Sequence, residues 1–489
     1  MKKIIQIAIV SFCVLVFVCI FNTFRVRNIP SFVSAGEKEI VPIDAAVKRL
    51  SKSIRFKTVS SLENPFLNAD QFLALNRHIE ESYPLLNSKL VKTKINDSSF
   101  FYEWKGSDPS LKPILLCAHS DVVDVEAATE SLWTASPFGG EIRDGFVWGR
   151  GSWDDKSSLF AILESVEILI RKGFSPKRSV FIAVGQDEEV VYGTSGAKAI
   201  TDTFKKMNLR FDYVLDEGQL VAENIVPGID KPVALVGIAG KGYLTIRLNV
   251  DLKEGGHSSM PSRETAIGIL SSALHRLENS PFPFSLNAVS RSTFEWLAPS
   301  MNLGSRFVFS NLWLFERILE SRLSEKNSTR AQLHTTTAIT KISGGFKDNV
   351  LPSRAEATVN FRIIQGDTNS SVLKRISKII NDDRVKVIVP ETLIEPSDVS
   401  ATDSKSFESI RVAILRTIPN AIVAPALMSA YTDSIHYSSV ADNAYRFFPV
   451  RANPEDLKRF HGIDERISIS NYEEIIRFYA EIIKNSNIQ

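Results

Sequence analysis

Residues 114–121 read Ile-Leu-Leu-Cys-Ala-His-Ser-Asp, a short apolar run that ends in an imidazole and a carboxylate. A continuous apolar run without alternation is typical of a strand buried on both faces, as in a parallel sheet. Similar runs follow at 180–184 and 213–215, and helical patterns at 157–171 and 194–207 lie between the three runs. Strands that alternate with helices predict right-handed crossovers and an α/β fold with a mostly parallel sheet.

Imidazole and carboxylate side chains follow the ends of these predicted strands. In open α/β sheets, ligands gather at the carboxyl ends of the strands. Carboxylates packed closely repel one another unless a cation lies among them, and imidazole with carboxylates is a ligand set that suits zinc. A solvated acidic rim is the simpler alternative for any single pair, but four clusters at one sheet edge favour a metal centre. The clusters are His119 with Asp121, Asp154 with Asp155, Asp187 with Glu188 and Glu189, and Asp216 with Glu217.

A second pattern begins near residue 240. Apolar and polar residues alternate along 243–252 and again along 355–363, which predicts antiparallel strands with one wet face. With a predicted helix at 264–278, this indicates a smaller α+β domain over 240–366. We interpret 40–239 and 367–489 as one catalytic domain interrupted by that insertion. The aromatic-rich stretch 281–330 is interpreted as an embellishment of the inserted domain.

The N-terminal segment is distinct from the rest. Lys2 and Lys3 precede an uncharged apolar run at 4–21, near the shortest length that spans a bilayer as a helix. Residues 1–35 are therefore interpreted as a signal-anchor, or as a signal peptide with a candidate cleavage site at Val33-Ser34-Ala35; a buried helix is the third alternative. The first two readings place the chain in the secretory pathway, either anchored with a lumenal or extracellular catalytic domain or secreted.

Composition limits the other function classes. The 489 residues favour two domains, and a net charge of +2 gives no strong field for binding nucleic acid. Cys117 is the only cysteine outside the apolar run, so it has no internal disulfide partner there, and core packing beneath His119 is its expected role. Sequons at Asn96, Asn327 and Asn369 would permit glycosylation.

Five motifs together resemble the co-catalytic zinc metallopeptidases. That family includes aminoacylase, carboxypeptidase S and the peptidase M20 domain proteins that make or hydrolyse N-fatty-acyl amino acids. The resemblance runs from about residue 45 to the C-terminus, and the apolar leader and aromatic insertion are most similar to the carboxypeptidase S and fatty-acyl branch. The motifs are AHSDVV at 118–123, WGRGSWDDK at 148–156, DEE at 187–189, GGHSS at 255–259 and HGIDE at 461–465.

The resemblance implies two zinc ions per chain. His119 would bind one ion, Asp154 would bridge both, and Glu189 and His461 would bind the other. The remaining ligand would be Asp216 or Glu217, with Asp216 preferred.

Two further carboxylates would act beside the ions. Asp121 resembles the carboxylate that orients the His119 imidazole, and Glu188 resembles the general base. Zinc lowers the pKa of bound water to about 7, so Glu188 could take a water proton and pass it to the leaving amine.

The resemblance also implies substrate contacts and a homodimer. His257 matches a histidine that reaches the oxyanion, often from a partner subunit, while Asn349 and Arg362 match positions that touch substrate. Structural roles are the alternatives for His257 and Arg362. The chain departs from the family at Ile435, where relatives often have an arginine for the substrate carboxylate; a protonated His436 is the nearest substitute.

The predicted function is zinc-dependent cleavage, or reversible formation, of the amide bond of N-acyl amino acids, especially N-fatty-acyl amino acids. A carboxypeptidase for short peptides is the alternative within enzymes. A catalytically inactive binding ectodomain is the alternative of another class, and it would be expected to lack metal ligands, none of which is missing here.

Overall fold

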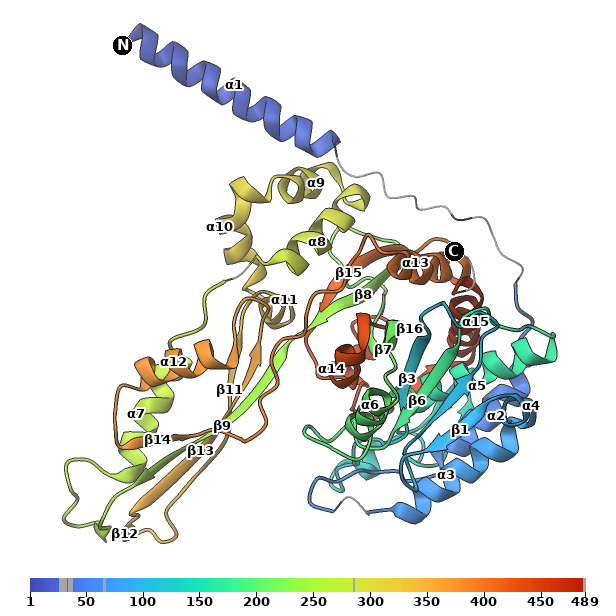
Figure 1. The fold of residues 1–489 in the computed structure, drawn as a ribbon. Helices are drawn as coiled ribbons and strands as arrows, with labels where there is room; N and C mark the ends of the chain where they lie inside the picture. Colours follow the sequence, from blue (N-terminus) through green and yellow to red (C-terminus); the bar gives the residue numbers. More distant parts are fainter. Residues whose placement is uncertain (26–32, 34–37, 65–66, 285, 487–489) are drawn as a thin grey trace.

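The computed structural model describes residues 1–25, 33, 38–64, 67–284 and 286–486. Figure 1 shows a larger unit built around an eight-stranded sheet and a smaller unit beside it. In spatial order the strands are β1 (Val91–Lys94), β2 (Phe100–Trp104), β6 (Val180–Gly185), β3 (Ile114–His119), β7 (Phe211–Ala222), β16 (Ala441–Ala452), β8 (Val233–Gly240) and β15 (Ile422–Met428). The four neighbouring strands β6, β3, β7 and β16 pair in parallel, so the predicted α/β fold with a mostly parallel sheet is confirmed.

Both faces of strand β3 are buried. Successive side chains of a strand point to opposite sides of the sheet, so its residues contribute alternately to two cores. Leu116 and Ala118 join the core beneath α5 (Lys156–Arg171) and α15 (Ile469–Asn485). Leu115 and Cys117 join a second core beneath α6 (Ala197–Lys206). This two-sided burial is the physical reason for the continuous apolar run, and Cys117 packs in the core as expected.

Helix α15 begins slightly earlier than its capping pattern predicts. Ser470 and Glu473 fit a capping box in the sequence, yet Ser468 is the N-cap, and its side chain accepts the backbone N–H of Asn471 at 3.2 Å. Strand β17 (Arg466–Ser468) pairs with β5 (Phe146–Trp148) and runs directly into the helix. Ser468 is therefore the last extended residue and takes the capping position.

The smaller unit is an antiparallel sheet covered by α7 (Ala266–Glu278) and α12 (Asn369–Ile380). The alternating apolar residues of 243–252 and 355–363 face these helices. Both α12 and the fourth strand follow residue 366, so the sheet continues past the predicted domain boundary, because Val372 and Ile376 complete its core. The spatial order is β11 (Thr336–Gly344), β13 (Arg354–Ile363), β9 (Gly242–Asp251) and β14 (Val385–Ile388).

The aromatic-rich stretch forms a helical insertion, residues 286–333, with packing of its own. Val289 and Trp296 of its first helix join the core of the larger unit, and a separate small core forms around Leu312 and Leu319. The interpretation of this stretch as an embellishment of the inserted domain is therefore wrong for its first helix. Its helices are α8 (Ala288–Leu297), α9 (Leu303–Ser310), α10 (Leu312–Leu323) and α11 (Asn327–Leu333).

Helix α1 (Lys2–Phe24) extends away from the rest of the protein beside this insertion (Figure 1). Its most apolar window has a mean hydropathy of 3.0 and is only 6% buried. Among the described residues it is the one helix long and apolar enough to cross a membrane. Ser34 and Ala35 of the candidate cleavage site lie outside the described residues.

Candidate metal centre

Four predicted ligands from distant parts of the chain meet at the carboxyl ends of the central strands. His119 ends β3, Asp154 precedes α5, Glu189 follows β6, and His461 follows β16. Asp154 Oδ1 lies 2.9 Å from His119 Nε2, and Asp154 Oδ2 lies 2.9 Å from His461 Nε2. His461 Nε2 lies 3.2 Å from Glu189 Oε1. The Asp154 carboxylate therefore lies between two imidazoles, with one oxygen directed at each.

Glu217, and not Asp216, lies among these residues. Ligand atoms of His119, Asp154 and Glu217 are within 4.8 Å of one another, and so are those of Asp154, Glu189 and His461. Asp216 instead accepts the backbone N–H of Ser434 at 2.5 Å. Neighbouring residues of a strand point to opposite faces, so only one of Asp216 and Glu217 can face the centre. The sequence-based preference for Asp216 is not supported by this geometry.

Asp121 holds the two strand ends together. Its Oδ1 lies 3.3 Å from His119 Nδ1, and its Oδ2 accepts the backbone N–H of Glu189 at 3.1 Å. The Ser60 hydroxyl also donates to Oδ2, at 2.5 Å. Ser60 was not predicted, because no spacing pattern connects it to the strand ends. Asp121 therefore orients the imidazole and the loop that carries Glu188 and Glu189.

The centre has an excess of buried negative charge. Burial raises the pKa of Glu188 well above its usual range, and the nearby carboxylates of Glu217 and Glu189 raise it further, while His119 lowers it. Burial lowers the pKa of His461, but hydrogen bonds to Asp154 and Glu189 outweigh burial and raise it to about 10. Glu189 Oε1 is buried and lies 3.2 Å from His461 Nε2. Buried carboxylates that outnumber the two imidazoles they surround fit divalent cations such as zinc.

Glu465 stabilises the loop that carries Asp154. Its buried carboxylate accepts the backbone N–H groups of Gly151 at 2.8 Å and Trp153 at 2.9 Å, and it pairs with Arg150. Arg150 Nη2 in turn donates to the His461 carbonyl at 3.0 Å. The HGIDE motif contains Glu465, but the sequence assigned it no role. This network joins the loops of two ligands that are far apart in sequence.

We expect Glu465→Gln to lower the free energy of unfolding by about 3–5 kcal/mol, because it leaves the buried Arg150 guanidinium without its counter-charge. Chemical denaturation in the presence of a chelator measures the loss without a contribution from metal. Glu141→Gln removes a surface ion pair with Arg143 and is expected to change stability by less than about 1 kcal/mol. Equal effects of the two substitutions would contradict the assigned role.

Arg362 lies between the smaller unit and the centre. Its guanidinium stacks over the Tyr243 ring at 4.5 Å, and its Nη1 is buried without an acceptor among the described residues. Burial lowers its pKa, and the charges of Tyr243 and Glu188 act in the opposite direction. The Arg362 guanidinium is therefore partly buried and stacked on an aromatic ring.

His257 and Asn349 lie elsewhere. They are exposed, beside the short pair of β10 (Gly256–His257) and β12 (Val350–Leu351), which Figure 1 shows at the far end of the smaller unit. The Ser259 backbone N–H donates to His257 Nδ1 at 3.2 Å, and the Ser258 N–H donates to the Asn349 carbonyl at 3.1 Å. Within one chain, the structure does not bring these two residues to the metal centre.

The segment with Ile435 is helical. Residues Ser434–Tyr437 form the short helix α14. Burial lowers the pKa of His436 to about 4, with the nearby Lys198 ammonium acting in the same direction. Its Nε2 lies 2.8 Å from the Tyr431 hydroxyl. A neutral His436 does not replace the missing arginine.

Comparison with known proteins agrees with this geometry. The chain is 42% identical over 463 residues to a probable carboxypeptidase S-like protein of Dictyostelium discoideum, covering 94% of this chain and 87% of the relative. It is 38% identical over 467 residues to an N-fatty-acyl-amino acid synthase/hydrolase of Mus musculus, covering 94% and 90%.

Solved structures show the same fold at low sequence identity. An M20 family metallo-carboxypeptidase of Sulfolobus solfataricus matches with a TM-score of 0.68 and 17% identity, covering 91% of this chain and 99% of the other. Human carnosine dipeptidase 1 matches with a TM-score of 0.65 and 15% identity, covering 91% and 97%. The family model for peptidase family M20/M25/M40 matches residues 115–485. With its ligand residues gathered at the strand ends, the chain belongs to this metallopeptidase family.

Proposed function

We propose that this protein is a zinc-dependent hydrolase that cleaves, or reversibly forms, the amide bond of N-fatty-acyl amino acids. The observation that carries the proposal is Asp154, whose two oxygens each lie 2.9 Å from a different imidazole. That arrangement suits a carboxylate shared by two cations. The similarity to the Mus musculus synthase/hydrolase supports the substrate class.

Two zinc ions would be held by overlapping ligand sets. His119, Asp154 and Glu217 form one set, and Asp154, Glu189 and His461 form the other. Bound zinc supplies Lewis-acid polarisation of the scissile carbonyl and a lower pKa for water.

Glu188 supplies the proton transfer. Its Oε2 lies 3.9 Å from His119 Nε2, and its carboxylate lies within 4.8 Å of ligand atoms of His119 and Glu189, at the edge of the two proposed ligand sets. It takes a proton from the attacking water and delivers it to the amide nitrogen as the C–N bond breaks. Burial favours the protonated form of Glu188, which makes it a proton donor in the second step.

Arg362 would bind the substrate carboxylate. Its buried, unpaired Nη1 is a donor without an acceptor, and a carboxylate would satisfy it with a charge-assisted hydrogen bond. This role compensates for Ile435, which cannot bind an anion. His257 and Asn349 would act on the centre of a second subunit in a homodimer, because both are exposed and distant from the centre of their own chain.

A substrate panel separates this activity from that of a peptidase for short peptides. We expect kcat/KM for N-oleoyl-phenylalanine to exceed that for alanyl-phenylalanine by at least about 100-fold, since each buried methylene contributes about 0.8 kcal/mol. Both compounds carry the same phenylalanine carboxylate and differ in the acyl group, which is a lipid chain in one and an alanyl group with a free ammonium in the other. Exclusive cleavage of the dipeptide would instead support a carboxypeptidase, the activity named for the Dictyostelium discoideum relative.

Retention of α1 as a membrane anchor is part of the proposal. Lys2 and Lys3 are the first residues of the helix, ahead of its apolar run, and its apolar surface is exposed along almost its whole length. A single-pass anchor would place the catalytic unit on the lumenal or extracellular side, where the exposed sequons at Asn96 and Asn327 could be glycosylated; Asn369, in the third sequon, is fully buried.

A further inference from the structure

The helical insertion has an exposed apolar flank next to the end of α1. Three side chains of α10 are exposed although they are large and apolar: Trp313 by 54%, Leu314 by 41% and Ile318 by 58%. Leu303, at the start of α9, is exposed by 66%. Clusters of this kind mark surfaces that contact another apolar phase.

The insertion holds the last turns of α1 by specific hydrogen bonds. Asn311 is fully buried, and its Nδ2 donates to the Cys19 carbonyl at 3.0 Å while its Oδ1 accepts from Asn22 Nδ2 at 3.0 Å. Arg306 Nε donates to the Thr23 carbonyl at 2.9 Å. The last four carbonyls of a helix have no partner within the helix, so the Arg306 bond satisfies the Thr23 carbonyl, while the Cys19 carbonyl also accepts from the Thr23 hydroxyl. Cys19 and Thr23 are buried, so one side of the end of α1 packs against protein, whereas Ile20, Phe21 and Phe24 on its other side are exposed.

The docked end of α1 coincides with the end of its apolar run. The uncharged run 4–21 is about 27 Å long at the rise of an α-helix, and the docked residues Cys19, Asn22 and Thr23 lie at its end. The hydrocarbon core of a bilayer is about 30 Å thick. With this run in the bilayer, the docked end of α1 and the insertion lie at the near boundary of the membrane.

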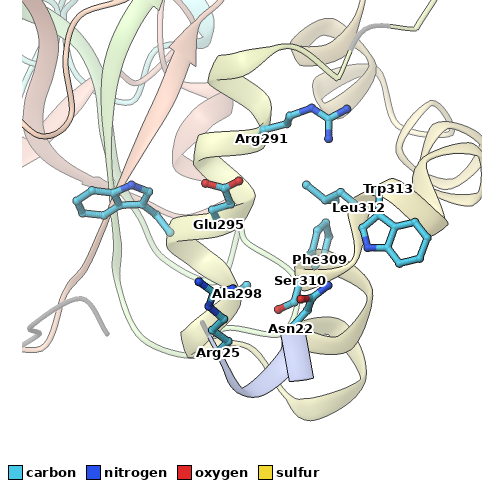
Figure 2. A pocket seen from close by; sticks show the side chains of 10 residues that line it. Asn22, Arg25, Arg291, Glu295, Ala298, Phe309, Ser310, Leu312 and Trp313 are labelled. Atoms are coloured by element: carbon cyan, nitrogen blue, oxygen red, sulfur yellow. The ribbon is translucent and has the colours of Figure 1, made fainter. Parts of the chain in front are cut away.

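A cavity of about 410 Å³ at this junction has the chemistry of a lipid headgroup contact (Figure 2). Arg25 and Arg291 bring guanidinium groups to its lining, and Trp313 and Phe309 bring aromatic rings. Glu295 also lines the cavity, and Arg291 forms an ion pair with Glu316 at 3.5 Å. Guanidinium groups bind phosphates, and tryptophan is enriched at the membrane–water interface.

We propose that the helical insertion is a membrane-contact surface, in which the exposed face of α10 lies in the headgroup region of the bilayer that α1 crosses. The proposal rests on the retention of α1 proposed above. Its occupant is a phospholipid bilayer: the exposed apolar side chains meet the acyl chains, and Arg25 and Arg291 meet the phosphates. The insertion thereby contacts the bilayer beside the point at which α1 leaves it.

Fluorescence quenching by brominated lipid tests the surface. The full chain is reconstituted in nanodiscs of phosphatidylcholine brominated at acyl carbons 6 and 7, with unbrominated lipid as the reference. We expect the emission of Trp313 to fall about two-fold, because an interfacial side chain lies within about 5–10 Å of the acyl boundary. Trp313→Phe should remove most of the quenching. Equal quenching in Trp313→Phe and in the unaltered chain, or no quenching, would overturn the proposal.

A matched control uses an exposed aromatic position far from α1. Phe346 is 83% exposed and follows β11 in the smaller unit. The emission added by Phe346→Trp is expected to be unaffected by bromine. Quenching at position 346 equal to that at 313 would mean that lipid contact is not specific to the insertion, and this too would overturn the proposal.

A cross-linking experiment tests the retention of α1 separately from the proposed membrane-contact surface. In a Cys19→Ser background, Asn22→Cys with Asn311→Cys is expected to form a disulfide, detected by mass spectrometry of the intact chain and its peptides. A mature chain that lacks residues 1–25 would refute the retained anchor and with it the surface. A retained α1 that forms no cross-link, or that forms it without quenching at Trp313, would refute the surface alone.

Discussion

Glu188→Gln is expected to lower kcat by about 10³-fold while zinc content and folding remain unchanged. The substitution keeps the size and hydrogen-bonding shape of the side chain but removes its ability to accept a proton. Since the two ligand sets that contain Asp154 do not need Glu188, metal should stay bound. Steady-state kinetics on an N-acyl amino acid, with elemental analysis of the same sample, measure both quantities.

A glutamate outside the centre provides the matched control. Glu223, just beyond β7, pairs with Arg451 at 2.7 Å on the surface, and Glu223→Gln is expected to change kcat by less than about two-fold. An unaltered rate in Glu188→Gln would remove the general base from the proposed mechanism. Loss of zinc along with activity would instead assign Glu188 to the metal ligands.

Asp154→Ala is expected to lower zinc content from two ions to fewer than one per chain and to lower kcat/KM by more than about 100-fold. Loss of residues that merely orient metal ligands costs about 10–100-fold, and Asp154 is common to both ligand sets. Its removal also leaves His119 and His461 without their shared carboxylate. Elemental analysis after gel filtration, followed by kinetics with added zinc, measures the effect.

The control for Asp154→Ala is Asp124→Ala, an exposed aspartate close in sequence to His119. It is expected to retain two zinc ions and the original rate. If Asp154→Ala also retained two ions, the carboxylate would not be shared, and the proposed centre would have to be built from separate ligand sets.

Much of the larger unit could be predicted because its signals are local. The apolar run 114–118 reflects burial on both faces of β3, and the acidic clusters after β3 and β6 and within β7 reflect a shared region of the sheet. Their convergence follows from the parallel pairing of these strands. Glu188 and Glu189 could be given separate roles because they are adjacent residues of a motif that resembles a known family.

Long-range packing decided the features that the sequence left open. The choice between Asp216 and Glu217 depends on which way β7 directs its side chains: the Glu217 carboxylate lies within 4.8 Å of ligand atoms of His119 and Asp154, whereas Asp216 accepts the Ser434 N–H. The smaller sheet extends to β14 because the apolar face of α12 completes its core, although no local signal marks that continuation. Ser60 and Glu465 act through contacts with residues that lie far away in the chain.

The sequence by itself determined the fold class, the family and the types of residue that surround the centre, because periodicity, strand-end composition and motif spacing are properties of neighbouring residues. Tertiary structure alone decided which carboxylate faces the imidazoles, that His257 and Asn349 lie away from the centre of their own chain, and that the helical insertion holds the end of α1. Each of these outcomes depends on side-chain direction or on contact between segments distant in sequence, and neither quantity is encoded in a local pattern.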